Sequence, residues 1–281
     1  MSRSSDAFRQ VDFHEPANPE VLRVPVTPPL VQNPTNIEAA YEIQRISTLP
    51  KPEAHVVVDS DNRNHTIREH FRYMEHQLRK LQQNAGVKRV LVTSSTPREG
   101  KTVVASNLAA TLASGGARVL LMDVDMRGPG NAALLGLKDP PGLAEVLEGR
   151  ATISQVLIYL EALNLYYLPS GQPLGDPADL VQGGHLQHIF TQLEEFAWIV
   201  VDSPPIGAFA DALSMADHAD GVILVVRSGM TAKRDLERSL AALKDCRIAG
   251  IVLNGHAKAQ KDYYSSYNKL RGNRNSRDAR K

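Results

Sequence analysis

Short apolar runs alternate with segments of helical periodicity between residues 65 and 256. The runs are rich in Val, Ile and Leu and show no polar alternation, which is typical of strands buried on both faces. The sequence predicts strands at residues 89–93, 118–122, 163–168, 198–201, 221–226 and 248–253. Alternation of strands and helices predicts an α/β fold with a mostly parallel sheet covered by helices on both faces.

Helical periodicity marks the segments between these runs. We predict helices at residues 65–84, 102–113, 176–195, 208–216 and 231–244. In the first of them an apolar stripe recurs at spacings of three and four and stops before Gly86, a typical helix terminator. The stripe consists of Ile67, Phe71, Met74, Leu78 and Leu81. This helix begins the folded domain, which we place at residues 65–256.

The two ends of the chain differ in composition from this domain. Eight of the 17 prolines fall between Pro16 and Pro52, so residues 1–60 are predicted to be a Pro-rich, largely disordered arm. A short amphipathic helix at 36–46 is the one exception; it either docks on the core or a partner or forms only transiently. Residues 257–281 are predicted to be a flexible basic tail, because they offer little to bury.

A phosphate-binding loop follows the first predicted strand. In the template G-x-x-x-x-G-K-[ST], Gly100, Lys101 and Thr102 match the end, and Ser95 stands at the first glycine position. A strand before the loop and a helix after it complete the Walker A arrangement. Backbone N–H groups and the helix N-terminus would bind ATP phosphates, with Lys101 on the β- and γ-phosphates and the Thr102 hydroxyl on Mg²⁺. The expected nucleotide-binding residues of the loop are Thr96, Pro97, Arg98, Glu99, Gly100, Lys101, Thr102 and Val103.

Acidic side chains stand directly after two other predicted strands. Asp123 and Asp125 follow residues 118–122, and Asp202 follows residues 198–201. Because ligands of parallel sheets bind at the carboxyl ends of the strands, these carboxylates are expected on the same rim as the phosphate loop. We expect Asp202 to hold Mg²⁺ as a Walker B aspartate does. One member of the Asp123/Asp125 pair would hold metal and the other accept a proton, with Arg127 near phosphate or one of these carboxylates.

Composition narrows the class of protein. A net charge of +1 argues neither for nor against nucleic acid, and 281 residues suffice for a full core. The single cysteine, Cys246, excludes an intramolecular disulfide and fits a reducing compartment. We expect no secretory signal, and no apolar run approaches the ~18–20 residues that span a bilayer, so membrane attachment is expected only through a partner.

Four segments together resemble the bacterial tyrosine kinases (BY-kinases) of capsule and exopolysaccharide export. Residues 95–102 (STPREGKT) are similar to their Walker A motif, 120–129 (LLMDVDMRGP) to Walker A′, 201–205 (VDSPP) to Walker B, and 251–254 (IVLN) to the last core strand. The resemblance covers about residues 65–256. It implies a three-layer, MinD-like P-loop NTPase fold and an ATP- and Mg²⁺-dependent protein-tyrosine autokinase.

The resemblance also implies roles for particular residues. Catalysis would involve Lys101, Asp123, Asp125 and Arg127, and Asn254 would contact adenine. The metal set would be Thr102, Asp123 and Asp202.

The first predicted helix carries part of the family's oligomerisation motif, Glu-x-x-Arg-x-x-Arg. Glu69 and Arg72 match it, whereas Glu75 replaces the last arginine. A ring-like homo-oligomer is therefore expected to differ from the family in its contact detail.

The tail carries Tyr263, Tyr264 and Tyr267 among eight Lys/Arg and two acidic residues. By resemblance these tyrosines are phosphoacceptors, modified in trans; the alternative is that they pack on the core or a neighbour. The resemblance further implies a membrane adaptor of the polysaccharide co-polymerase (chain-length-determinant) type and a tyrosine phosphatase, with no nucleic-acid partner. The kinase would be cytoplasmic, held at the inner membrane through the adaptor.

Two other functions fit the same fold. A ParA/MinD-type positioning ATPase would carry a second lysine early in the loop, where Thr96 stands, and glycines where Pro97 and Arg98 stand. A non-catalytic nucleotide-binding regulator would not need the full Lys101 and aspartate set.

Overall fold

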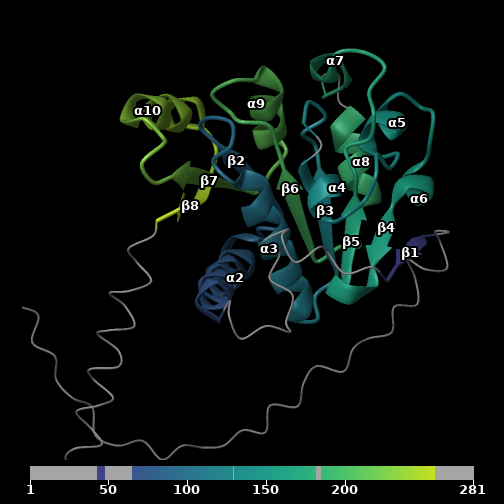
Figure 1. Cartoon of the computed structure of the whole chain (residues 1–281), viewed down its shortest axis with the longest axis horizontal. Coiled ribbons are helices and arrows are strands. Elements are labelled where there is room, and N and C mark those ends of the chain that lie inside the picture. The colour runs from purple at the N-terminus through teal and green to yellow at the C-terminus, as the bar shows by residue number, and fades with distance from the viewer. Residues whose placement is uncertain (1–42, 48–64, 129, 182–184, 257–281) are drawn as a thin grey trace, which may run out of the picture. The chain divides into compact units, whose positions relative to one another are not determined.

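The computed structural model describes residues 43–47, 65–128, 130–181 and 185–256. Its eight strands form one sheet in the order β1-β4-β5-β3-β6-β2-β7-β8 (Figure 1). Strands β5, β3, β6, β2, β7 and β8 run parallel, whereas β4 pairs antiparallel to β5 and parallel to β1. The strands are β1 Gln44–Ile46, β2 Arg89–Ser94, β3 Val119–Asp123, β4 Ile158–Leu160, β5 Leu165–Leu168, β6 Trp198–Asp202, β7 Gly221–Arg227 and β8 Ile248–Asn254. The predicted mostly parallel sheet is confirmed.

Helices cover both faces of the sheet, as expected for a three-layer α/β/α fold. The helices are α2 His65–Ala85, α3 Lys101–Ser114, α4 Gly130–Leu134, α5 Leu143–Leu147, α6 Ile153–Val156, α7 Pro177–Val181, α8 His185–Gln192, α9 Ala210–Asp217 and α10 Lys233–Ala242, with a 3-10 turn at Glu161–Leu163. One core cluster packs α2 and α3 against the sheet. The other packs the helices from α5 through α10 against it. No helix in the described part of the chain is long and apolar enough to cross a membrane.

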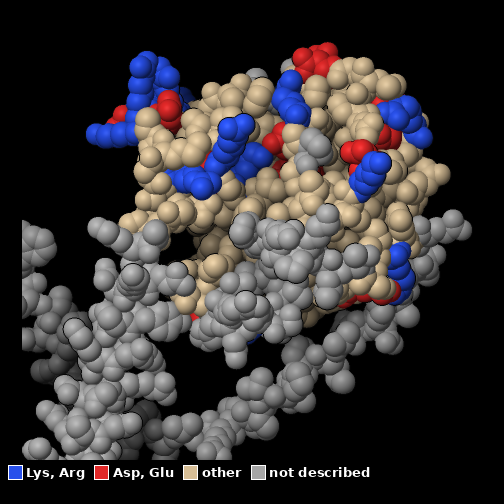
Figure 2. All heavy atoms as spheres, in the orientation of Figure 1, with Lys and Arg blue, Asp and Glu red and all other residues tan. Residues whose placement is uncertain are grey.

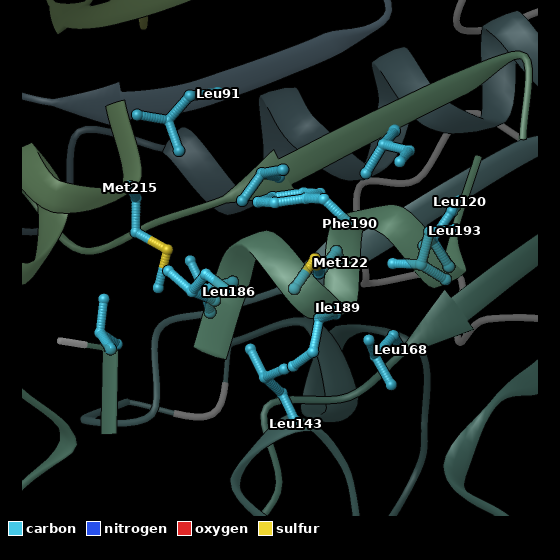
Figure 3. Packing of buried hydrophobic residues seen from close by; sticks show 14 of the residues in the cluster. Leu91, Leu120, Met122, Leu143, Leu168, Leu186, Ile189, Phe190, Leu193 and Met215 are labelled. Atoms are coloured by element: carbon cyan, nitrogen blue, oxygen red, sulfur yellow. The ribbon is translucent and has the colours of Figure 1, made fainter. Parts of the chain in front are cut away.

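The two cores divide the strand residues by alternation. In β3, Leu120 and Met122 belong to one cluster and Val119 and Leu121 to the other, because successive side chains of a strand point to opposite faces. Figure 3 shows Leu120, Met122 and Leu168 packing with α8 residues on the first face. The central strands are therefore fixed from both sides, which holds their carboxyl ends in place.

Residues 44–46 form a strand, so the predicted helix at 36–46 is wrong in this part; residues 36–42 lie outside the described residues. Gln44, Arg45 and Ile46 pair in parallel with Ile158, Tyr159 and Leu160. Backbone pairing with an open sheet edge outweighs the weak local helix pattern, and Ile43 and Ile46 still pack on the two cores. Apart from residues 43–47, the predicted arm lies outside the described residues, as does the tail.

The predicted helix at 176–195 is two helices, α7 and α8. The sequence between them contains Gly183 and Gly184. Glycine disfavours a helix interior because its backbone loses the most conformational freedom on folding, so two in a row oppose one continuous helix.

The last strand is not covered on both faces, contrary to the expectation for every strand. In β8, Ile251 and Leu253 are 52% and 58% exposed, whereas Ala249 and Val252 pack on the α2–α3 cluster. This strand pairs with β7 alone among the described strands. Its apolar run therefore reflects burial of only one face.

Candidate active site

The phosphate loop joins β2 to α3 and needs glycine at position 100. Gly100 has φ +93°, and a Cβ there would lie 2.1 Å from Nδ2 of Asn254. That amide donates a hydrogen bond of 2.9 Å to the carbonyl of Glu99. The terminal strand β8 thus supports the loop directly, and the predicted adenine contact Asn254 lies against the loop backbone.

A buried carboxylate organises the loop from within. Glu99 is fully buried, and its Oε2 accepts hydrogen bonds from the backbone N–H groups of Ser95 (2.8 Å) and Thr96 (3.2 Å). Its Oε1 accepts from the hydroxyls of Thr96 (2.9 Å) and Thr231. The sequence predicts Glu99 as a nucleotide-binding residue of the loop but does not indicate this supporting role, because the partner Thr231 lies 132 positions away and no local signal links the two.

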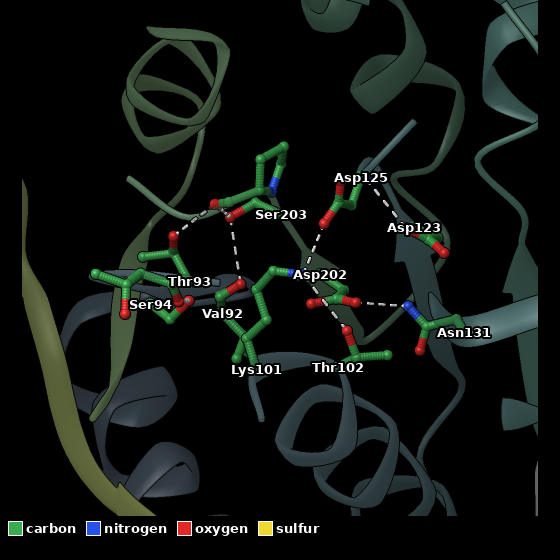
Figure 4. A network of polar contacts seen from close by, with 12 residues as sticks. Val92, Thr93, Ser94, Lys101, Thr102, Asp123, Asp125, Asn131, Asp202 and Ser203 are labelled. Carbon is green, nitrogen blue, oxygen red and sulfur yellow. Dashed lines mark hydrogen bonds and ion pairs between the residues drawn. The ribbon is translucent and has the colours of Figure 1, made fainter. Parts of the chain in front are cut away.

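Lys101 lies in the middle of the site and forms an ion pair with Asp125. Its Nζ is 2.7 Å from Oδ2 of Asp125 and 3.5 Å from Oγ1 of Thr102 (Figure 4). Burial lowers the pKa of Lys101, but the carboxylates of Asp202 and Asp125 outweigh this and raise it. The ammonium is therefore held in its charged form, ready to bind an anion.

Two carboxylates lie at the floor of the site. Asp123 ends β3 and Asp202 ends β6, and the two residues are paired neighbours in the sheet. They are 0% and 1% exposed. Burial, reinforced by Asp202, raises the pKa of Asp123 well above its usual range, and burial raises that of Asp202 to about 6. The ends of β3 and β6 therefore lie on one rim of the sheet, as predicted.

Each of these two carboxylates carries an oxygen that lacks a hydrogen-bond partner among the described residues, Oδ2 of Asp123 and Oδ1 of Asp202. A buried carboxylate oxygen without a hydrogen-bond donor or a bound cation destabilises the fold. A divalent cation at the open oxygen of Asp202, beside Thr102, would satisfy that acceptor, so the residues present fit Mg²⁺. The described residues hold no cluster of three His, Cys, Asp or Glu side chains that could bind a metal. Mg²⁺ typically takes only one or two carboxylates and completes its shell with water and phosphate oxygens.

An asparagine absent from the sequence predictions orients Asp202. The Nδ2 of Asn131, at the start of α4, donates to Oδ2 of Asp202 (2.7 Å). Its Oδ1 accepts from the hydroxyl of Ser106 (2.7 Å), which also donates to the carbonyl of Thr102. Asn131 lies in a stretch without apolar periodicity, so nothing in the sequence marked it.

Tyr167 of β5 is a second unpredicted neighbour. It is fully buried, and its hydroxyl makes no hydrogen bond of normal geometry with the described residues. Burial, with Asp123 nearby, raises its pKa well above the usual value. A neutral hydroxyl thus lies beside the Asp123 carboxylate.

Arg127 lies farther out than the other predicted catalytic residues. Its Nη2 is 2.9 Å from Oδ1 of Asp176, and its guanidinium stacks 4.8 Å from the ring centre of Phe209. Asp176 therefore fixes the arginine at the outer edge of the aspartate loop.

The predicted oligomerisation residues lie on the exposed surface of α2. Glu69 and Arg72 form an ion pair of 2.9 Å with each other, and Glu75 pairs with Arg79 at 2.8 Å. Glu75, which stands where the motif has arginine, is thus engaged within its own helix. The predicted acceptors Tyr263, Tyr264 and Tyr267 lie outside the described residues.

Comparison with known proteins places this arrangement in a family. The family model described as "ParA: NUBPL iron-transfer P-loop NTPase" matches residues 86–274. The chain is 32% identical over 184 residues to the tyrosine-protein kinase YwqD of Bacillus subtilis (strain 168), covering 64% of this chain and 78% of the relative. It is 34% identical over 175 residues to the tyrosine-protein kinase CpsD of Streptococcus pneumoniae serotype 4, covering 60% and 76%.

Solved structures agree on the fold. The kinase domain of the Escherichia coli tyrosine kinase ETK superposes with a TM-score of 0.66 at 23% identity, covering 78% of this chain and 91% of that domain. At this identity the likeness concerns the fold alone.

Proposed function

Since this chain belongs to the bacterial tyrosine-protein kinases, within the ParA-type P-loop NTPases, we propose that it phosphorylates Tyr263, Tyr264 and Tyr267 in the tail of a second copy, using ATP and Mg²⁺. The observation that carries the proposal is the 2.7 Å contact between Lys101 and Asp125, directly above the buried Asp123 and Asp202. It brings a phosphate-binding cation, metal-binding carboxylates and a candidate base into one site.

The nucleotide would be held by the phosphate loop. Lys101 and the loop N–H groups bind the β- and γ-phosphates, and the N-terminal end of α3 adds its positive dipole. Thr102, Asp123 and Asp202 would hold Mg²⁺, which neutralises charge on the β- and γ-phosphate oxygens when bound. Asn131 keeps Asp202 in orientation through its 2.7 Å hydrogen bond.

Asp125 is better placed than Asp123 to act as the base. Asp123 is fully buried and faces Asp202, whereas Asp125 lies on the loop after β3 and reaches the Lys101 ammonium. Asp125 would take the proton of the tyrosine hydroxyl as the tyrosine oxygen bonds to the γ-phosphorus. The bond from that phosphorus to the bridging oxygen breaks at the same time, and ADP leaves.

The Lys101–Asp125 contact also connects ATP binding to the role of Asp125 as the base. While the ammonium is paired with Asp125, it occupies the carboxylate oxygen that would accept the proton. Phosphate oxygens compete for the same ammonium. Bound ATP would therefore draw Lys101 towards the phosphates and leave Asp125 free to accept a proton.

We further propose that phosphorylation of the tail regulates capsule or exopolysaccharide polymerisation and export. The supporting observation is membership of the family to which YwqD and CpsD belong. A membrane adaptor of the polysaccharide co-polymerase type would hold the kinase at the inner membrane, and a tyrosine phosphatase would reset it. The exposed pair of Glu69 and Arg72 on α2 would contribute to self-association.

The test is to incubate the purified chain with ATP and Mg²⁺ and to locate phosphate by intact-mass and peptide mass spectrometry. A Lys101→Met chain is the control. We expect phosphate on Tyr263, Tyr264 or Tyr267 of the parent chain only.

Absence of phosphotyrosine, even after a candidate adaptor's cytoplasmic segment is added, would contradict the proposal. ATP hydrolysis without phosphotyrosine would then favour a positioning ATPase of the ParA/MinD type. Nucleotide binding without hydrolysis would favour a regulator.

A further inference from the structure

An apolar pocket lies between α5, α6 and α8 and shares no lining residue with the candidate active site. It has a volume of about 240 Å³. We propose that this pocket is the docking site of the chain's own N-terminal arm and that Tyr41 fills it. The arm before Ile43 lies outside the described residues, so the observations that support this docking come from the pocket and from residues 43–47.

The inside of the pocket is apolar. Ile153 and Ile189 are buried members of the core cluster beneath it. Val146, Leu147 and Ala151 form its walls and pack against the same cluster. The described residues that line the pocket include no Asp, Glu, Lys or Arg. In Figure 2 the surface at the position of α6 is likewise uncharged, whereas charged side chains lie near α5 and β1. Such a hollow favours an apolar occupant.

The arm is fixed at the sheet edge beside this pocket. Strand β1 pairs in parallel with β4. The Nη1 of Arg45 is 3.7 Å from Oε1 of Glu161, and its guanidinium carbon lies 5.5 Å from the ring centre of Tyr159. Ile43 packs against the core cluster that lies beneath the pocket. The chain therefore arrives at residue 43 in contact with the core onto which the pocket opens.

Parallel pairing gives the direction from which the arm arrives. Gln44 pairs with Ile158, the first residue of β4, and α6 ends at Val156, two residues earlier. The chain that precedes Ile43 therefore starts beside α6. Tyr41 is three residues from Gln44, or roughly 10 Å of extended chain. Since α6 rises only roughly 6 Å over its four residues, Tyr41 can reach the pocket wall at the start of this helix.

Side-chain alternation directs Tyr41 to the face of the sheet on which the pocket lies. Ile43 packs on the cluster that contains α8, whereas Ile46 packs on the other cluster. Arg45 lies over Tyr159, which belongs with the cluster of Ile43. The odd-numbered positions of this segment thus face α8. Tyr41 is the next odd position, so an arm that continues extended carries its ring towards α6 and α8.

A tyrosine suits the size and the rim of the pocket. Pockets for drug-sized ligands start at roughly 300 Å³, so about 240 Å³ suits one large side chain. His185 and His188 are exposed on the rim, three positions apart on α8 and therefore on one helix face. Their imidazoles can exchange a hydrogen bond with the phenol hydroxyl, which a buried tyrosine usually needs. Tyr41 is the only Phe, Tyr or Trp between Phe13 and Phe71.

Connectivity favours the chain's own arm over that of a second copy. Only two peptide bonds separate Tyr41 from Ile43, which already packs on the core. Docking therefore orders a very short piece of chain, and the tether gives the ring a high local concentration at the pocket. The arm of a second copy would have to compete with this intramolecular contact.

The test uses the full chain at low concentration, with the photoreactive residue p-benzoylphenylalanine in place of Tyr41. Irradiation should link it to residues 146–153 and 185–192, located by peptide mass spectrometry. The same probe in place of Ala40 is the control, because an even position faces the other cluster. Gln192→Trp, at the pocket rim, should lower the yield of these links about fivefold or more, because its ring fills the space that the arm needs. Gln187→Trp, exposed on α8 but outside the lining, should leave the yield unchanged.

Hydrogen exchange tests the natural side chain without the probe. Tyr41→Ala should speed exchange of the backbone N–H groups of residues 146–153 about threefold or more, because an empty pocket opens more readily. Tyr73→Ala is the matched control, since Tyr73 is 66% exposed on α2 and its loss should leave this exchange unchanged.

Links between copies, detected in a mixture of light and heavy-isotope chains, would assign the pocket to a neighbour's arm and overturn the proposal. So would an absence of links to α5, α6 and α8, equal yields in the two Trp variants, or unchanged exchange in Tyr41→Ala. None of these readouts depends on phosphate transfer, so failure of the proposed kinase function would leave this test unaffected.

Discussion

The phosphate loop depends on the side chain of Glu99, a buried carboxylate whose hydrogen bonds go to the loop itself and to Thr231. We predict that Glu99→Ala weakens the fold around the loop by about 2–6 kcal/mol, because the N–H groups of Ser95 and Thr96 each lose a buried partner at about 1–3 kcal/mol. Glu99→Gln should cost only about 1–2 kcal/mol. Its oxygen can still accept from the two N–H groups, and its amide can donate to the hydroxyls of Thr96 and Thr231.

Urea denaturation without nucleotide measures this cost, and the only tryptophan, Trp198, reports it because it is fully buried in β6. Calorimetric titration with ADP detects a loop that detaches locally instead of unfolding the domain. The control is Glu237→Gln, since Glu237 is exposed on α10 and its change should stay within about 0.5 kcal/mol.

The expected order of ADP affinity is parent, then Glu99→Gln, then Glu99→Ala. The proposed role of Glu99 is refuted if the free energy of unfolding of Glu99→Ala lies within about 0.5 kcal/mol of the parent's and the variant binds ADP as tightly as the parent. Such a result would mean that the hydrogen bonds of Glu99 do not hold the loop.

Three further predictions concern other polar groups. Asp202→Asn should stabilise the chain without Mg²⁺ above pH 6 by about 3 kcal/mol. Burial raises the pKa of Asp202 from 3.8 to about 6, so the parent loses stability as pH rises between these values; urea denaturation at pH 4 and pH 8 should show the gain only at pH 8. Asn131→Ala removes the hydrogen bond to Asp202 and should lower ADP affinity about tenfold with Mg²⁺ but not without it, by calorimetry. Asp220→Asn should cost about 1–3 kcal/mol at pH 7. Burial raises the pKa of Asp220, but hydrogen bonds from Arg89 and the backbone outweigh this and lower it, so the parent's advantage should fade below about pH 4, measured by the same denaturation.

The sequence by itself determined the layers and the phosphate loop. Apolar runs that alternate with helical stripes specify a parallel sheet between helices, and β2, β3 and β6 formed where these runs predicted them. The motif around Lys101 and the positions of Asp123 and Asp202 after apolar runs placed the candidate site at one rim. These inferences succeeded because they depend on local periodicity and on the shared direction of parallel strands.

Tertiary structure alone decided what depends on pairing between distant segments. Gln44–Ile46 became a strand because β4 offered a free edge, and β8 left Ile251 exposed because none of the described helices covers that face. The partners of the active-site carboxylates are equally remote, such as Asn131, 71 positions from Asp202. A hydrogen bond between residues so far apart leaves no periodic mark in the sequence, since it depends on where the folded backbone brings the two side chains.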